Sequence, residues 1–363
     1  MVSCADSCGG DCCGSGGVFL DGQDFPVPGD LIGSGYVQTP CESKAGLLTC
    51  SKKESLPLIF DRTGEVREGF FVLGWSHNPI YLLNGKEPVL FDGGLALLGG
   101  VYREAIASVL KGRSPATVFI THVHFDHCGA VPFLKRAFPG LKAAASSKAA
   151  DILKRPNAVR LIKELSEGAA GVLSEFDEAA LVRDPFEAFE MDRVLQEGDR
   201  VELEDGLTVQ VFATPGHTWD FLSYYVPEKK ILVASESAGS ELSSGQIETD
   251  CLTDFGVYLD SLKRLLTLDA RILCLGHRYV YVDEEVGAFL QRSLENALEF
   301  KAKVEECWVK EGQDFGRIAA RIRAVEYDPL PFPKQLEAAY LINLEARIKS
   351  VLKHLGLEKA SPL

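Results

Sequence analysis

Residues 121–127 read THVHFDH, so three of the chain's seven histidines and one aspartate fall within six positions. In an extended chain alternate side chains share a face, which would point His122 and His124 in the same direction. Asp126 and His127 follow where we expect the chain to turn into a helix, and they could face a second ion. Imidazole nitrogen and carboxylate oxygen suit zinc, iron or manganese, whereas a packed core would not tolerate such a cluster. The segment therefore predicts a metal centre.

Three further ligand candidates each follow a predicted strand. His217 lies in TPGHT, Glu236 lies in ASES and His277 lies in LGHRY. A rigid sheet holds functional side chains on the loops at the ends of its strands, so we expect these three residues to join the cluster. Trp219 and Asp220 come directly after His217 and are candidates for the wall of a substrate pocket.

Alternating apolar residues and turn signals predict the elements that would position these side chains. In the first half, we expect strands at 55–60, 69–75, 78–83, 88–92 and 117–120, the last running directly into the histidine cluster. A second strand-rich half follows at 200–213, 221–235 and 271–275. Residues 147–190, between the two halves, have a mostly helical pattern. The chain is therefore expected to be an α/β protein with a helical insertion at about 147–190.

The strand signals stop after residue 283, and three helices are expected at 284–312, 313–326 and 333–356. The third helix has Pro333 at its start and Gly356 at its end. Its apolar residues form one stripe: Leu336, Tyr340, Leu344, Ile348, Val351 and Leu355. We therefore divide the chain into a Cys/Gly-rich arm (1–52), an α/β body (53–283) and a C-terminal helical region (284–363). The helices of the last region could also join copies of the chain in a homo-oligomer.

Composition limits the partners that the protein is expected to have. The chain has 38 Lys and Arg against 52 Asp and Glu, a net charge of −14, without an obvious basic patch. Because such a chain repels phosphate backbones, we expect no nucleic-acid partner and a small-molecule substrate instead. Apolar runs are too short to span a bilayer, and residues 1–17 lack the features of a signal peptide. These observations predict a cytoplasmic protein without a membrane partner.

Ten cysteines are expected to be free thiols in that compartment. Four of them crowd the N-terminal arm: Cys4, Cys8, Cys12 and Cys13. A thiolate metal site is conceivable there, but the spacing matches none of the common two-residue knuckles. We favour incidental thiols in a disordered tail.

Taken together, the motifs resemble those of the metallo-β-lactamase fold, in the glyoxalase-II-like H-x-H-x-D-H form. They run in the family's order over about residues 55–283: FDGG with Asp92, THVHFDH, TPGHT, ILVAS followed by an acid, and GH. The resemblance implies an αββα sandwich with its site at one edge of the two sheets. It implies one metal ion held by His122, His124 and His217, and a second held by Asp126, His127 and His277. Asp92 would orient the histidine loop by hydrogen bonds.

The chain departs from the family at the residue that bridges the two ions. The usual residue is aspartate, whereas this sequence has Glu236, one methylene longer. Glu236 could still bridge the ions. It could instead bind only one of them, lengthen the distance between them, or leave the second site weakly filled. The three histidines of the first site are intact in each case.

The expected activity is hydrolysis. Two divalent ions, zinc most readily and iron or manganese as alternatives, would activate a water for attack on a small ester or thioester. Besides ligation, we consider an acid–base role for Asp126. Members with a helical C-terminal region use it to help bind the substrate's thiol carrier, which favours a thioesterase.

Two other readings stay open at this point. In one, the protein contains iron and reacts with oxygen or nitric oxide, as a reductase or a sensor of the same fold. In the other, it is a binding protein with a decayed site, although six intact ligands argue against decay. A nuclease of this fold is disfavoured by the net charge.

Overall fold

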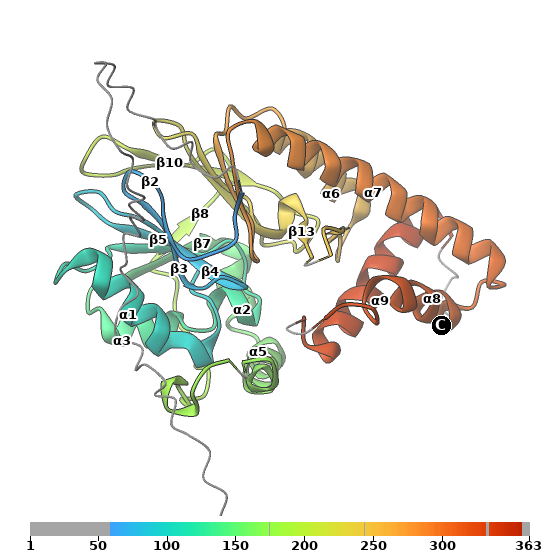
Figure 1. Cartoon of the computed structure of the whole chain (residues 1–363), viewed down its shortest axis with the longest axis horizontal. Coiled ribbons are helices and arrows are strands. Elements are labelled where there is room, and N and C mark those ends of the chain that lie inside the picture. The colour runs from blue at the N-terminus through green and yellow to red at the C-terminus, as the bar shows by residue number, and fades with distance from the viewer. Residues whose placement is uncertain (1–58, 174, 243, 332–333, 358–363) are drawn as a thin grey trace, which may run out of the picture. The chain divides into compact units, whose positions relative to one another are not determined.

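Two β-sheets of seven strands each form the body of the protein in a computed structural model, which describes residues 59–173, 175–242, 244–331 and 334–357 (Figure 1). The first sheet has its strands in chain order: β2 (Gly64–Arg67), β3 (Phe70–Trp75), β4 (Asn78–Leu83), β5 (Val89–Phe91), β6 (Thr117–Phe119), β7 (Lys142–Ser146) and β8 (Arg193–Leu195). Strands β5 to β8 run parallel to one another. The predicted N-terminal arm and its cysteines lie outside the described residues.

The second sheet has the order β1-β16-β15-β12-β11-β10-β9. Its strands are β1 (Ile59–Phe60), β9 (Arg200–Glu202), β10 (Thr208–Ala213), β11 (Leu222–Val226), β12 (Ile231–Val233), β15 (Ile272–Cys274) and β16 (Val280–Val282). A separate short hairpin consists of β13 (Ser240–Glu241) and β14 (Ile247–Glu248). Both predicted strand-rich halves are present, and each contributes mainly to one sheet.

The two sheets pack face to face through apolar side chains. Phe91 and Phe119 of the first sheet lie with ring centroids 5.9 and 5.3 Å from that of Tyr224 in the second. These three residues belong to one buried cluster between the sheets. Alternate residues of the strands face outward, where they need a cover of helices.

Helices supply that cover on both outer faces. The first sheet is covered by α1 (Gly99–Leu110) and α3 (Val131–Ala137), which share a buried cluster with its strands. The second is covered by α6 (Phe255–Leu265) and α7 (Glu284–Lys310) in another cluster. The layers are therefore helix, sheet, sheet, helix, which confirms the predicted αββα sandwich.

Residues 147–190 are helical in their first part only. They begin with α4 (Ser147–Ile152) and α5 (Pro156–Gly168), followed by the 3₁₀ turns η2 (Ala169–Val172) and η3 (Glu178–Ala180). Ser146 caps α4 by accepting a hydrogen bond from the Ala149 N–H, and Pro156 starts α5. Residues 181–190 form neither helix nor strand, so the predicted insertion is less helical than expected.

The C-terminal helical region begins at α7, directly after β16, and continues with α8 (Phe315–Glu326) and α9 (Glu337–His354). The predicted stripe of the last helix is correct at its centre, because Tyr340, Leu344, Ile348 and Val351 are buried. Helix α9 begins later than predicted, because Leu336 still has an extended backbone (ψ 126°). No helix of the described residues is long and apolar enough to cross a membrane.

Candidate metal centre

Strand direction brings the predicted ligands to one edge of the sandwich. In the first sheet, β6 ends just before Thr121, and the short helix α2 (Phe125–Cys128) follows. In the second sheet β10, β12 and β15 all run in the same direction, since β11 is antiparallel to both β10 and β12. His217, Glu236 and His277 follow the carboxyl ends of these three strands. A hydrogen bond from Leu222 N–H to the carbonyl of Thr121 (2.9 Å) joins the two edges.

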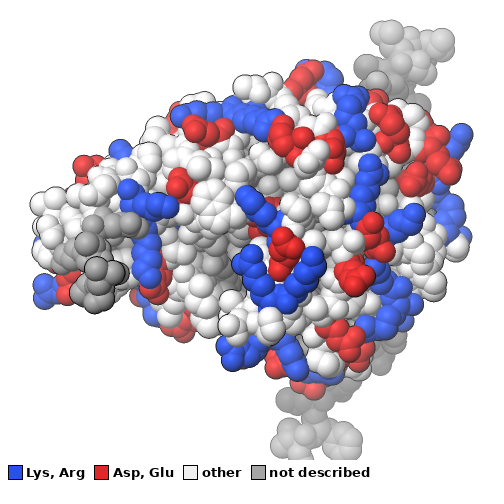
Figure 2. Space-filling model, turned by 180° about the vertical axis from the view of Figure 1, so that it is seen from behind, with Lys and Arg blue, Asp and Glu red and all other residues white. Residues whose placement is uncertain are grey.

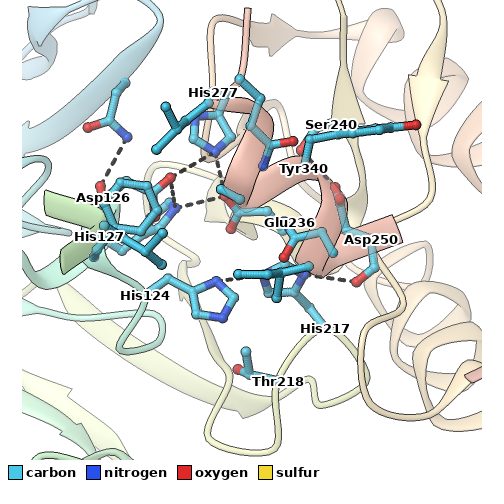
Figure 3. Close-up of a pocket in the computed structure, with 18 of the residues that line it drawn as sticks. His124, Asp126, His127, His217, Thr218, Glu236, Ser240, Asp250, His277 and Tyr340 are labelled. Atoms are coloured by element: carbon cyan, nitrogen blue, oxygen red, sulfur yellow. Dashed lines mark hydrogen bonds and ion pairs between the residues drawn. The ribbon is translucent and has the colours of Figure 1, made fainter. Parts of the chain in front are cut away.

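Three histidines form the first group of converging side chains. Ligand nitrogens of His122, His124 and His217 lie within 4.8 Å of one another, and Nδ1 of His124 is 3.2 Å from Nε2 of His217. Figure 3 shows His124 and His217 pointing toward each other. The Nε2 atom of His122 is buried and has no hydrogen-bond partner among the described residues. A buried, unpartnered nitrogen beside two others is the donor set that a zinc-like cation fits.

Neighbouring groups fix the orientation of two of these rings. Nδ1 of His122 lies 3.0 Å from the hydroxyl of Thr121, and its ring stacks on Phe221 with centroids 4.6 Å apart. Nδ1 of His217 donates to the carbonyl of Asp250 at 2.8 Å. Such contacts on one ring nitrogen leave the other free to ligate.

The electrostatics of this group favour neutral rings. Burial lowers the pKa of His217 to about 3, and His124 adds to the effect. Burial, together with His127 and His124, lowers the pKa of His122 well below its ordinary value. Burial also lowers the pKa of His124, although Asp126 opposes it. Neutral imidazoles offer the lone pairs that a metal ion needs.

A second group contains Asp126, His127 and His277, whose ligand atoms also lie within 4.8 Å of one another. Nε2 of His277 is 3.5 Å and Nε2 of His127 is 3.8 Å from Oδ2 of Asp126. The opposite nitrogens are held in place, since Nδ1 of His127 lies 3.0 Å from Oδ2 of Asp92 and Nδ1 of His277 lies 3.1 Å from the carbonyl of His77.

Glu236 lies between the two groups. Its Oε1 is 2.8 Å from Nε2 of His127 and 3.0 Å from Nε2 of His277, while Ser235 donates to Oε2 at 2.7 Å. Glu236 also forms a candidate ligand set with His122 and His127. Figure 3 shows its carboxylate between the imidazoles of the two groups.

The longer glutamate fits because residue 276 is a glycine. A Cβ atom at Gly276 would lie 2.2 Å from Oε1 of Glu236, well inside van der Waals contact. Glu236 is itself 4% exposed, in the 3₁₀ turn η4 (Ser235–Ala238) after β12. The Glu236–Gly276 combination therefore places a carboxylate within reach of both groups.

Carboxylates make the second group attractive to cations. Burial opposes charge on His127, but Glu236 and Asp126 outweigh it and raise the pKa well above its ordinary value. Burial also opposes charge on His277, but its hydrogen bond with Glu236 outweighs it and raises the pKa to about 9. Burial alone would raise the pKa of Glu236, whereas His127 and His277 hold it well below its ordinary value. The local field thus stabilises positive charge.

Asp92 holds the start of the histidine loop. Its Oδ1 accepts hydrogen bonds from the backbone N–H (2.8 Å) and hydroxyl (3.0 Å) of Thr121, and its Oδ2 faces Nδ1 of His127. The residue is 2% exposed and has a left-handed backbone (φ 60°), a conformation that only surrounding contacts can enforce. These contacts are the ones expected of an orienting residue.

The two pocket candidates occupy different positions. Trp219 is 45% exposed and lies at the cavity described below, with the ammonium of Lys148 5.6 Å from the centroid of its ring. Asp220 also lines the cavity, but its carboxylate is buried and accepts a hydrogen bond from Val123 N–H at 3.0 Å. Asp220 thus has a structural partner, whereas Trp219 presents an open aromatic surface.

Both ligand groups open into a cavity of about 680 Å³. Its walls come from α4, α5, the β13–β14 hairpin and the α8–α9 segment, and they include Trp75, His77 and Arg278 beside the ligands. Sequence reasoning missed His77 and Asp250, which hold ligand histidines through backbone carbonyls. It also missed Arg278. Every residue has a carbonyl, so no residue-type signal could have identified the first two.

Comparison with known proteins places the chain in context. Residues 73–277, more than half of the chain, match the family model described as the metallo-beta-lactamase superfamily. A hydroxyacylglutathione hydrolase of Bartonella tribocorum is 29% identical over 191 residues, which are 52% of this chain and 59% of that protein. An atrochrysone carboxyl ACP thioesterase of Aspergillus fumigatus is 25% identical over 203 residues, 55% of this chain and 50% of the relative. The chain thus spans about half the length of these curated relatives.

Solved structures support the same fold. A metallo-beta-lactamase family protein of Thermus thermophilus superposes with a TM-score of 0.55 at 20% identity, covering 80% of this chain and 95% of that one. At this identity the likeness concerns the fold.

Proposed function

The chain belongs to the metallo-beta-lactamase superfamily, and we propose on this basis that it is a dinuclear metal-dependent hydrolase of esters or thioesters. The observation that carries the proposal is the position of Glu236, whose carboxylate lies beside both ligand groups. A carboxylate shared by two groups of imidazoles is suited to two cations.

The donor atoms fit two divalent ions. His122, His124 and His217 would hold one ion through neutral nitrogens, and the unpartnered Nε2 of His122 is the clearest sign of that site. Asp126, His127 and His277 would hold the second, with Glu236 shared between them. When bound, such ions lower the pKa of a water and polarise a carbonyl oxygen. The mixed nitrogen and oxygen donors favour zinc, with iron or manganese as alternatives.

The chain's own residues would orient the reaction. Asp92 and the carbonyls of Asp250 and His77 keep ligand rings fixed, which holds the site in one geometry. Asp126 is partly exposed to the cavity, with 18% of its side chain accessible. We assign to its carboxylate the transfer of a proton toward the departing alcohol or thiol, beside its role as a ligand.

The relatives support an acyl substrate. One is named a hydroxyacylglutathione hydrolase and the other an acyl-carrier-protein thioesterase. The C-terminal helices line the same cavity as the metal ligands, so a substrate reaching the ligands would contact α9.

Metal analysis combined with a hydrolysis assay tests the proposal. Protein purified anaerobically without added metal should contain about two zinc ions per chain, show no visible absorption, and hydrolyse acyl thioesters. His217→Ala should lose the first ion and the activity. The matched control is His354→Ala, an exposed histidine on α9. Iron with a spectrum that changes in air, and no thioester hydrolysis, would refute the proposal in favour of oxygen or nitric oxide chemistry.

A further inference from the structure

We propose that the cavity selects an anion with an apolar body, namely an ester or thioester with an extended apolar acyl group and a carboxylate or phosphate group bound by Arg278. The inference rests on the proposed hydrolase function for the bond that is broken. It goes further in assigning the chemical class of the substrate and the residues that recognise it.

Two helical segments supply apolar walls of the cavity. Helix α5 contributes Leu161, Ile162 and Leu165, and the α9 segment contributes Leu336, Ala339 and Ile342. The segments approach each other at one end, where a Cβ atom on Gly168 would lie 3.4 Å from Cδ2 of Leu336. A cavity of about 680 Å³ between such walls has the size that encloses a drug-sized ligand.

Large apolar side chains remain exposed around this cavity. Leu161 is 45% exposed, Trp219 45% and Ile342 49%. Single exposed apolar residues are ordinary, but three that line one cavity form a surface that a bound apolar group would cover. An acyl chain or ring bound in the cavity would contact these side chains and shield them from water.

Basic side chains without an acidic partner line the cavity beside its carboxylates. Every carboxylate that lines it has an imidazole, guanidinium, hydroxyl or backbone N–H partner. Lys148, Arg155 and Arg278 also line it, and they form no ion pair with any residue of the described ranges. On the face that Figure 2 draws, basic and acidic side chains are interspersed. These three basic side chains, rather than the net charge of the cavity, are the groups that could bind an anion there.

Of these three basic residues, Arg278 lies nearest in sequence to a proposed ligand, because it directly follows His277. Its backbone is left-handed (φ 62°), which a non-glycine residue adopts only when its surroundings enforce it. Its Nε is buried without a hydrogen-bond partner among the described residues, and so is Nδ1 of His77 beside it in the cavity wall. The Arg278 side chain as a whole is partly exposed and lines the cavity, so its guanidinium could bind an anionic group there.

The anionic group could belong to either half of the substrate. It could be a carboxylate on the acyl group, or a phosphate on the thiol carrier. A set of four thioesters separates these sources: hexanoyl and 5-carboxypentanoyl groups, each on coenzyme A and on the neutral N-acetylcysteamine. Metal-loaded protein should hydrolyse at least one anionic member with a kcat/KM about ten- to a hundredfold above that of hexanoyl-N-acetylcysteamine, because a charge-assisted hydrogen bond contributes that much.

Arg278→Gln should reduce this ratio of anionic to neutral substrate to near one. Arg155→Gln changes an exposed residue and should also reduce this ratio. The test therefore does not depend on correct folding of the Arg278→Gln protein alone. The matched control is Arg103→Gln on α1, whose guanidinium contacts the exposed Glu104 and should leave the ratio unchanged. An unchanged ratio in Arg278→Gln with hydrolysis intact would overturn the anionic assignment while leaving the proposed function standing.

A binding measurement tests the same inference without catalysis. The fluorescent probes 1-anilinonaphthalene-8-sulfonate and N-phenyl-1-naphthylamine share an apolar body and differ in charge. Arg278→Gln should weaken binding of the anionic probe about tenfold and much more than that of the neutral one. Leu161→Gln should weaken both about three- to tenfold, whereas Leu298→Gln, equally exposed on α7, should not.

The outcomes separate the two levels of the argument. If no thioester is hydrolysed but the probe results are as expected, the proposed function fails and the selectivity for apolar anions stands. If Arg278→Gln weakens the binding of both probes equally, the assignment of an anionic group to Arg278 is overturned. If Leu161→Gln leaves the binding of both probes unchanged, the assignment of the cavity to an apolar group is overturned.

Discussion

Replacing Arg347 by methionine should destabilise the folded chain by about 3–5 kcal/mol, the range found when one partner of a buried ion pair is removed. Arg347 lies on α9 and is 1% exposed. Its guanidinium contacts Oε1 of Glu248 at 2.5 Å and Oε2 of Glu326 at 3.2 Å, and it lies 4.3 Å from the centroid of Phe300. The substitution keeps the apolar stem and removes the charge.

The size of the effect follows from what remains behind. The side chain of Glu248 is 11% exposed and that of Glu326 is 5% exposed, so neither can regain full hydration when the guanidinium is lost. Among the residues that the structure describes, only Lys303, whose ammonium is 3.5 Å from Oε1 of Glu326, would still compensate. Two carboxylates left in a poorly hydrated place account for several kcal/mol.

The effect should depend on pH. Burial raises the pKa of Glu248 and Arg347 opposes that rise, so removing Arg347 should raise the pKa of this carboxyl further. A carboxyl whose pKa is higher in the folded than in the unfolded chain loses folded-state stability as pH rises between the two values. The stability lost by Arg347→Met, relative to wild type at each pH, should therefore be larger at pH 8 than at pH 5.

Urea unfolding followed by circular dichroism measures the difference. The control is Arg321→Met on α8, whose side chain is 54% exposed and whose pair with Glu311 should contribute at most about 1 kcal/mol. Adding Glu248→Gln and Glu326→Gln to Arg347→Met should recover much of the loss, because no buried charge then lacks a partner. A loss below about 1 kcal/mol in Arg347→Met, equal to that of the control, would refute the reasoning.

Three further predictions concern the proposed metal centre. Gly276→Ala should displace the Glu236 carboxylate and weaken the second ion at least about tenfold while the first stays bound, as measured by metal titration; equal loss of both ions would contradict this. Asp92→Asn should lower kcat about ten- to a hundredfold, because the ring of His127 loses its carboxylate partner; unchanged kcat and metal affinity would exclude an orienting role. Chelation of the ions should lower the unfolding free energy by about 2.7 kcal/mol if they were present at a hundredfold their Kd; calorimetry with and without chelator would reveal no shift if the sites do not bind metal.

The sequence allowed these side chains to be predicted as neighbours, because their residue types are rare in a core and follow predicted strands, whereas their role as metal ligands stays a prediction. His122 and His124 alternate on an extended segment, and His217 and His277 each follow a buried strand, so parallel strand ends bring them together. Contacts between residues that are far apart in the sequence were harder to predict. The fit of Glu236 against Gly276 depends on how β12 and β15 lie side by side, which no local pattern expresses.

The burial of Arg347 could have been predicted from the sequence. It is seven residues from Tyr340 and three from Leu344, so helical periodicity places it on the buried face of α9. A charged residue on such a face needs buried partners of opposite sign, and Glu248 and Glu326 come from segments remote in sequence. Residues 181–190 were predicted to belong to a mostly helical insertion, but the helical pattern upstream does not continue through them.

Helix α9 therefore connects to the site in two independent ways. On its buried face, Arg347 holds Glu248, and two residues further on the carbonyl of Asp250 holds the ring of His217. On its exposed face, Ile342 lines the cavity. Because these contacts are separate, changes at Arg347 should affect folding and metal binding, and should therefore lower the activity toward every substrate to the same extent. Changes at Ile342 should instead affect which substrates are accepted, leaving the metal content as it was.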